Sequence, residues 1–93
     1  MSIEILYLWY IFYEVIKVSR SFGEKIRSLR EESGINQTEL GMALNMTQRK
    51  ISYIETGKYE PSISDIVSFC TFFKVSSDYL LAIPQGYKYP IRK

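Results

Sequence analysis

The stretch that decides the fold is residues 36–58, NQTELGMALNMTQRKISYIETGK. Asn36 and Thr47 each precede apolar residues at helical spacing, and their side-chain oxygens can accept hydrogen bonds from the free N–H groups of a helix start. Glu39, three residues after Asn36, completes a capping box. These signals predict two short helices, at 37–44 and 48–56.

The residues around the junction of these two helices favour a tight turn. A close helix crossing needs a small side chain, and Gly41 occupies that place despite its low helix propensity. Asn45 is the best choice besides glycine for a left-handed turn residue, and Gly57 suits the end of the second helix. Two short helices joined in this way, the second beginning with polar residues, can place that second helix in the major groove of DNA.

Capping signals continue on both sides of this pair. Ser21 with Glu24 predicts a helix at 22–33, which Gly34 ends. Ser62 with Asp65 repeats the capping box and predicts a fourth helix that runs to about residue 74.

A fifth and shorter helix is expected after Ser76, and Pro84 ends it. Residues 21–83 are therefore predicted to form an all-α domain of five helices. Residues 84–93 form a short basic tail, which could be an extended arm.

Residues 1–20 form an apolar N-terminal arm. Nine residues without charge, 5–13, lie between Glu4 and Glu14, too few for a membrane span of about 20 residues. A signal peptide would need a positive leader and a cleavage site, and neither is present. Aromatic and β-branched residues suit a strand, but the length favours a helix. We expect this helix to pack partly against its own domain and partly against a second subunit.

Composition narrows the classes of function. A chain of 93 residues has room for one domain, and its net charge of +2 does not mark a nucleic-acid binder by itself. The absence of histidine and the single Cys70, set in an apolar run, argue against a metal site, a disulfide framework and an enzyme. We expect no cofactor, a Cys70 thiol in the core, and a reducing cytoplasm as the location.

Residues 22–83 resemble the phage-repressor and Cro type of helix-turn-helix, the XRE family with the lambda-repressor-like fold. The motif comprises 36–40, the turn at 45–47, 48–58, Pro61 with Ser62, and 75–81. Two features depart from the family. Gly41 and Asn45 stand where alanine and glycine are usual, and the N-terminal arm is an addition that casts doubt on the fifth helix as the sole dimer surface.

The resemblance implies roles for individual residues. Gln37 and Lys58 match phosphate contacts, and Arg30 with Glu55 matches a structural ion pair. Gln48, Arg49, Ser52 and Tyr53 match the base-reading face. The Gln48 amide can bond adenine and the Arg49 guanidinium can bond guanine, and each such pair is worth about 1–3 kcal/mol of discrimination between bases. Lys50 is expected to contact phosphate rather than a base. The expected DNA-binding residues are Gln37, Thr47, Gln48, Arg49, Lys50, Ser52, Tyr53 and Lys58.

The expected function is that of a sequence-specific transcriptional regulator, a repressor that binds double-stranded DNA as a homodimer. Its recognition helices would lie about 34 Å apart on a palindromic operator. An alternative is an antitoxin-type module that binds a toxin through the N-terminal arm and also binds its own operator. A simpler alternative is that Gln48, Arg49 and Lys50 form only a solvated helix face.

Overall fold

A computed structural model of the chain describes residues 3–82, except for the side chains at 14–16 and 18–20. These residues form five α-helices and no strand, which confirms the all-α fold. The helices are α1 (Ile3–Glu32), α2 (Gln37–Leu44), α3 (Gln48–Glu55), α4 (Ile63–Phe73) and α5 (Ser77–Leu80). The basic tail expected at 84–93 lies outside the described residues.

Four of the predicted helix starts are confirmed. Asn36 and Glu39 form a reciprocal capping box at α2, and Ser62 and Asp65 form another at α4. The Thr47 hydroxyl accepts a hydrogen bond from the Lys50 backbone N–H at 3.0 Å. The Ser76 hydroxyl accepts one from the Tyr79 N–H at 3.2 Å at the start of α5. These caps place the starts of α2 to α5 at the predicted residues.

The predicted break before residue 22 is wrong, because the arm and the first helix of the domain form the single helix α1. Ser21 therefore lies inside a helix, where the carbonyl groups of the preceding turn take up the backbone N–H groups and no cap is needed. The sequence from 17 to 24 contains no proline, and the only glycine there, Gly23, costs about 1 kcal/mol relative to alanine. Nothing in this stretch is strong enough to end the helix.

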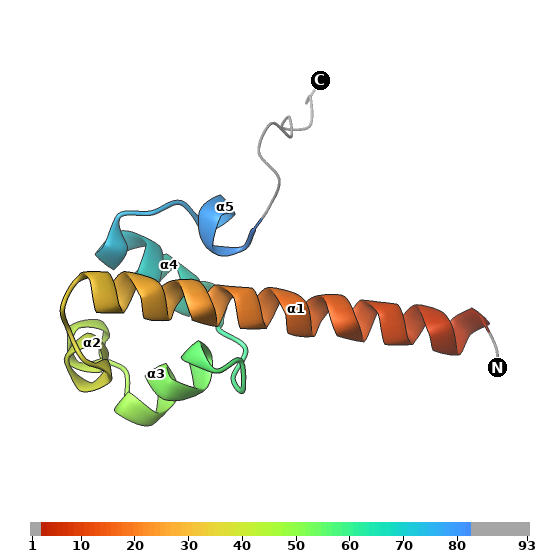
Figure 1. The fold of residues 1–93 in the computed structure, drawn as a ribbon, viewed down its shortest axis with the longest axis horizontal. Coiled ribbons are helices and arrows are strands. Elements are labelled where there is room, and N and C mark those ends of the chain that lie inside the picture. Colours follow the sequence, from red (N-terminus) through yellow and green to blue (C-terminus); the bar gives the residue numbers. More distant parts are fainter. Residues whose placement is uncertain (1–2, 83–93) are drawn as a thin grey trace, which may run out of the picture.

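The N-terminal part of α1 extends away from the other helices (Figure 1). The ten large apolar side chains between Ile3 and Tyr13 are between 41 and 84% exposed. The arm is thus helical, as expected, but the expectation that these side chains pack on their own domain is wrong. Among residues 3–82, no helix is long and apolar enough to cross a membrane.

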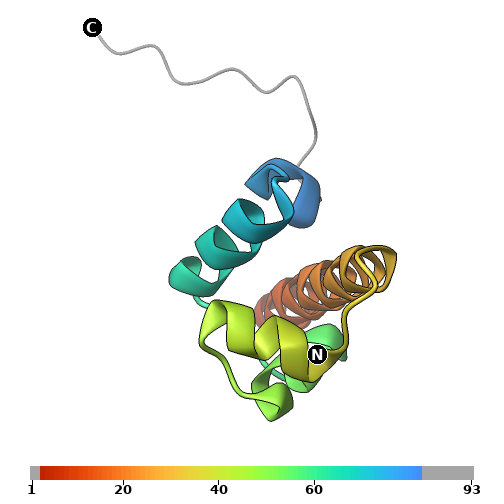
Figure 2. The same cartoon turned by 90° about the vertical axis from the view of Figure 1, so that its left-hand side faces the viewer.

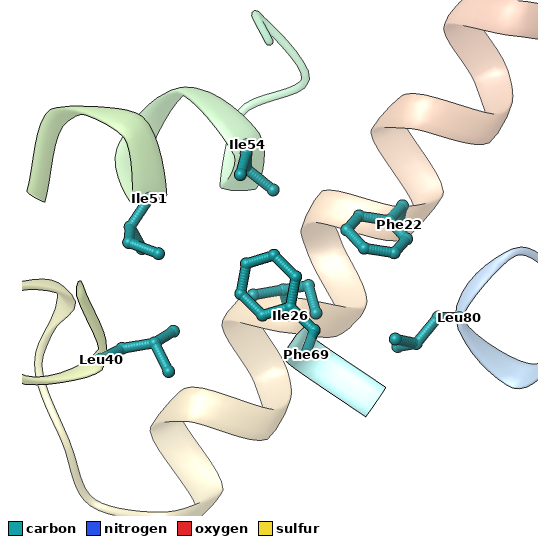
Figure 3. Packing of buried hydrophobic residues seen from close by; sticks show 7 residues of the cluster. All are labelled: Phe22, Ile26, Leu40, Ile51, Ile54, Phe69 and Leu80. Carbon is teal, nitrogen blue, oxygen red and sulfur yellow. The ribbon is translucent and has the colours of Figure 1, made fainter. Parts of the chain in front are cut away.

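The core lies where the other four helices meet the second half of α1. Figure 1 shows α2 and α3 on one side of α1 and α5 on the other, with α4 crossing behind α1. Figure 2 shows the same helices with α1 viewed nearly end-on. Seven buried side chains fill the centre (Figure 3): Phe22, Ile26, Leu40, Ile51, Ile54, Phe69 and Leu80.

Contacts between these side chains join elements that are far apart in sequence. The rings of Phe22 and Phe69 meet edge to face with their centroids 5.8 Å apart, which ties α1 to α4. Cys70 is half-buried against the same core, and burial raises the pKa of its thiol. Each fully buried side chain of this size contributes about 1.5–3 kcal/mol, so the core holds the helices in one arrangement.

Candidate nucleic-acid interface

The turn between α2 and α3 has the geometry that its residues predicted. Asn45 adopts the left-handed conformation, with φ 56° and ψ 45°. The Met46 N–H donates to the Gly41 carbonyl at 2.7 Å, and a Cβ atom added at Gly41 would lie 2.5 Å from the Met46 carbonyl oxygen. The backbone of the turn therefore lies directly against α2, and the two helices form one unit.

An ion pair connects this unit to α1. The Arg30 guanidinium donates from Nε to Glu55 Oε2 at 2.7 Å and from Nη2 to Glu55 Oε1 at 3.1 Å. The hydrogen bond to Glu55 raises the pKa of Arg30, and Arg30 Nη1 also donates to the Ile35 carbonyl at 3.0 Å. The Glu55 side chain is only 2% exposed. The end of α3 is thus held against α1 and against the loop before α2.

Two glutamines extend this network towards the surface. Gln37 Nε2 donates to Glu55 Oε1 at 3.1 Å, and the Gln37 amide oxygen accepts a hydrogen bond from Gln48 Nε2 at 2.6 Å. The orientation of both amides is therefore determined by the buried carboxylate. Within residues 3–82, the Gln48 amide oxygen and its second amide hydrogen make no further hydrogen bond.

Helix α3 has one buried face and one exposed face. Ile51 and Ile54 are fully buried in the core. Gln48, Arg49 and Tyr53 are exposed on the other side, and Ser52 is half-buried. The Thr47 side chain is exposed at the helix start, where its hydroxyl serves as the cap.

Lys58 continues this exposed surface beyond the helix. Its Nζ lies 5.9 Å from the centroid of the Tyr53 ring, and its backbone N–H donates to the Tyr53 carbonyl at 2.8 Å. The expected DNA-binding residues other than Lys50 thus lie in three neighbouring parts of the chain. These are the start of α2 (Gln37), the cap and exposed side of α3 (Thr47, Gln48, Arg49, Ser52 and Tyr53) and the loop after α3 (Lys58).

Lys50 is directed elsewhere. Its Nζ lies 2.9 Å from Asp65 Oδ1 at the start of α4 and 5.3 Å from the centroid of the Tyr59 ring. The Lys50 side chain is 31% exposed and that of Asp65 is 7% exposed. This lysine is therefore engaged within the domain, in contrast to the phosphate contact expected for it.

Two structural residues were not identified in the sequence. Gly23 packs against the end of α3, since an added Cβ would meet the carbonyl oxygens of Ile54 and Glu55. Lys25 donates to the Tyr79 carbonyl at 2.7 Å and thereby joins α1 to α5. A glycine inside a helical pattern is a signal of close packing and could have revealed Gly23. No local signal points to Lys25.

The described part of the chain contains no group of three or more His, Cys, Asp or Glu side chains that could hold a metal ion. The surface of α2 and α3 instead offers amide, guanidinium, hydroxyl and ammonium groups. These are the groups that donate hydrogen bonds to base edges and to phosphates.

Comparison with known proteins agrees with this geometry. The family model of a helix-turn-helix domain matches residues 21–82. The P22 c2 repressor, solved in complex with the synthetic operator 9T, is 32% identical, with 64% of this chain and 91% of that chain covered and a TM-score of 0.61. The clp gene regulator ClgR from C. glutamicum is 26% identical, with 70% and 84% covered and a TM-score of 0.63.

A transcriptional regulator from Listeria innocua is also similar, with 26% identity, 74% of this chain and 64% of that chain covered, and a TM-score of 0.65. No curated protein sequence matches the chain. The chain belongs to the helix-turn-helix family, in its phage-repressor type, a class of DNA-binding regulators. The family match begins at residue 21, so the arm lies outside it.

Proposed function

We propose that this protein is a sequence-specific transcriptional repressor that reads its operator with α3 in the major groove. The observation that carries the proposal is the hydrogen-bond chain from buried Glu55 through Gln37 to Gln48. It orients a glutamine amide on the exposed surface before DNA arrives. A side chain that is already oriented loses less conformational entropy on binding.

Gln48 and Arg49 are the proposed base readers. The free amide oxygen and second amide hydrogen of Gln48 match the N6 amino group and N7 of adenine. The exposed guanidinium of Arg49 matches O6 and N7 of guanine. Ser52 and Tyr53 lie one turn further along α3, where they can contact neighbouring bases, and Thr47 lies at its start.

Gln37 and Lys58 are the proposed phosphate contacts. Gln37 uses one amide hydrogen for Glu55 and retains the other for a phosphate oxygen. Lys58 brings a positive charge to the loop that follows α3. These contacts would fix the position of α3 on the duplex without carrying sequence information.

We also propose that the protein acts as a homodimer on a palindromic operator, with the arm as part of the dimer contact. The ten exposed apolar side chains at 3–13 present roughly 1,000 Å². This total is spread around the helix, and one partner can cover mainly the face that includes Ile5, Leu8, Trp9 and Phe12. A standard interface buries about 800 Å² per partner, so such a face can form part of a dimer contact. A two-fold dimer would give each half-site one copy of α3.

The same exposed arm supports the second candidate, an antitoxin-type protein that binds a toxin as well as DNA. The two functions differ in what covers the arm. Sedimentation of the purified chain should give a dimer if a second copy covers it. A monomer, both free and on DNA, would contradict the homodimer.

Selection of bound fragments from random double-stranded DNA tests the main proposal. We expect enrichment of an inverted repeat with half-sites about one helical turn apart. Fragments without a shared motif, at the same affinity as random DNA, would contradict sequence-specific binding.

A further inference from the structure

The interactions of Lys50 set it apart from the exposed polar residues of α3, Gln48, Arg49 and Tyr53. Its ammonium nitrogen lies 2.9 Å from the Asp65 carboxylate and 5.3 Å from the centroid of the Tyr59 ring. The backbone N–H of Lys50 is also occupied, by the hydroxyl of the cap residue Thr47. Both the main chain and the side chain of this residue are thus engaged inside the domain.

The Asp65 carboxylate is held from two sides. Oδ1 accepts from Lys50, and Oδ2 accepts from the Ser62 backbone N–H at 3.0 Å in the α4 capping box. Burial raises the pKa of Asp65, but the hydrogen bonds from Ser62 and Lys50 outweigh burial and hold it below its usual value. The carboxylate is therefore ionised at neutral pH, and Lys50 is the cation that balances its charge.

Tyr59 extends the same cluster into the loop between α3 and α4. Its backbone N–H donates to the Tyr53 carbonyl at 3.2 Å, and the neighbouring Lys58 N–H donates to the same carbonyl at 2.8 Å. Lys50 therefore contacts both the start of α4 and the loop that follows α3.

We propose that Lys50 is a positioning residue that fixes α3 to the start of α4 and does not neutralise a DNA phosphate. For Lys50 to reach a phosphate, its ammonium would have to leave Asp65, and that would strand a carboxylate that is 7% exposed. Leaving a buried charge without its partner is strongly unfavourable. The inference rests on the proposed DNA binding of α3 and assigns Lys50 a different role there from Lys58.

The salt dependence of DNA binding separates these roles, because its slope counts the phosphates that the protein neutralises. Lys50→Met removes the charge and keeps most of the apolar stem, and Lys58→Met is the matched control. We expect Lys58→Met to make the slope of log K against log salt shallower by about 0.9 for each phosphate that the lysine neutralises in the wild type. Lys50→Met should leave the slope unchanged and reduce the preference for operator over random DNA several-fold, because α3 is held less firmly.

Asp65→Asn provides a second measurement that keeps Lys50 in place. Without the carboxylate, the Lys50 ammonium is released, so the slope should stay the same or become steeper by up to about 0.9, the value for one phosphate. A slope that falls in Lys50→Met as it does in Lys58→Met would overturn the proposal. So would unchanged operator preference in both Lys50→Met and Asp65→Asn.

A double-mutant cycle between Lys50 and Asp65, measured by urea unfolding without DNA, makes the inference independent of the proposed function. We expect the two substitutions to be coupled by on the order of tenfold in the unfolding equilibrium constant. Additive effects would overturn the positioning role of Lys50 even if the protein binds DNA. Failure of the wild-type protein to bind any DNA would instead overturn the proposed function, while the coupling would still report on the link between α3 and α4.

Discussion

Arg30 of α1 and Glu55, the last residue of α3, form a bidentate ion pair with hydrogen bonds of 2.7 and 3.1 Å. Glu55 is buried and also orients Gln37, so this pair links the stability of the domain to the surface proposed to read DNA. Substitutions that change stability and DNA binding separately test the roles assigned to these residues.

Arg30→Met should lower the free energy of unfolding by about 3–5 kcal/mol, because it leaves the buried Glu55 carboxylate without its cation. Urea unfolding followed by circular dichroism measures this decrease. Adding Glu55→Gln to the same chain should recover part of it, since the unpaired charge is then removed. A single substitution that costs less than about 0.5 kcal/mol would mean that the pair is dispensable.

Gly23→Ala should destabilise the protein by about 1–3 kcal/mol, even though alanine is the better helix former. The added Cβ would meet the carbonyl oxygens of Ile54 and Glu55, the second at 2.7 Å, and neither backbone group can move freely. Ser28→Ala, at an exposed position of the same helix, is the control and should be neutral or slightly stabilising. Equal effects of the two substitutions on the urea midpoint would contradict the close packing of α1 on α3.

Arg49→Ala should weaken binding to the selected operator by about 1–3 kcal/mol per half-site and change binding to random DNA much less, because it removes a contact to base edges. Lys58→Ala should weaken binding to both DNAs, with a shallower salt dependence. Titrations of both variants with both DNAs at several salt concentrations provide the comparison. Indistinguishable effects would show that the recognition face has been misplaced on α3.

Acidification should remove the contribution of Asp65 to stability. Its folded pKa lies below the ordinary value of 3.8, so the stabilisation is fully present above about pH 4 and is lost as the pH falls through the lower, folded pKa. The difference in unfolding free energy between the wild type and Asp65→Asn should therefore be largest near neutral pH and shrink below about pH 4. A difference that is independent of pH would show that the carboxylate charge is not the stabilising feature.

Replacing Trp9 and Phe12 with serine should weaken the proposed dimer at least tenfold, because it removes two large apolar side chains, 69 and 64% exposed, from one face of the arm. The control is Ile63→Ser, which changes an apolar residue that is 82% exposed on α4. Analytical ultracentrifugation over a range of concentrations measures the dissociation constant. If the double variant dimerises as the wild type does, the arm does not form the dimer contact.

The starts of α2 to α5 could be predicted from the sequence because helix caps are local. Asn36, Thr47, Ser62 and Ser76 each bond a backbone group three residues ahead, so spacing alone identifies them. The left-handed turn at Asn45 is local in the same sense, because it depends on which residue types tolerate that backbone conformation. The pairing of Arg30 with Glu55 was expected only from the family resemblance.

The structure alone decided which local signals take effect and which residues distant in sequence meet. Ser21 and Glu24 have capping-box spacing, yet α1 passes through them, because a cap signal does not by itself interrupt a helix. Gly23 contacts α3 about thirty positions later in the chain. The sequence indicates that Lys50 is polar and that Asp65 can cap a helix. Only the folded arrangement of the helices brings their charges within 2.9 Å, because that contact depends on where α3 and the start of α4 lie relative to each other.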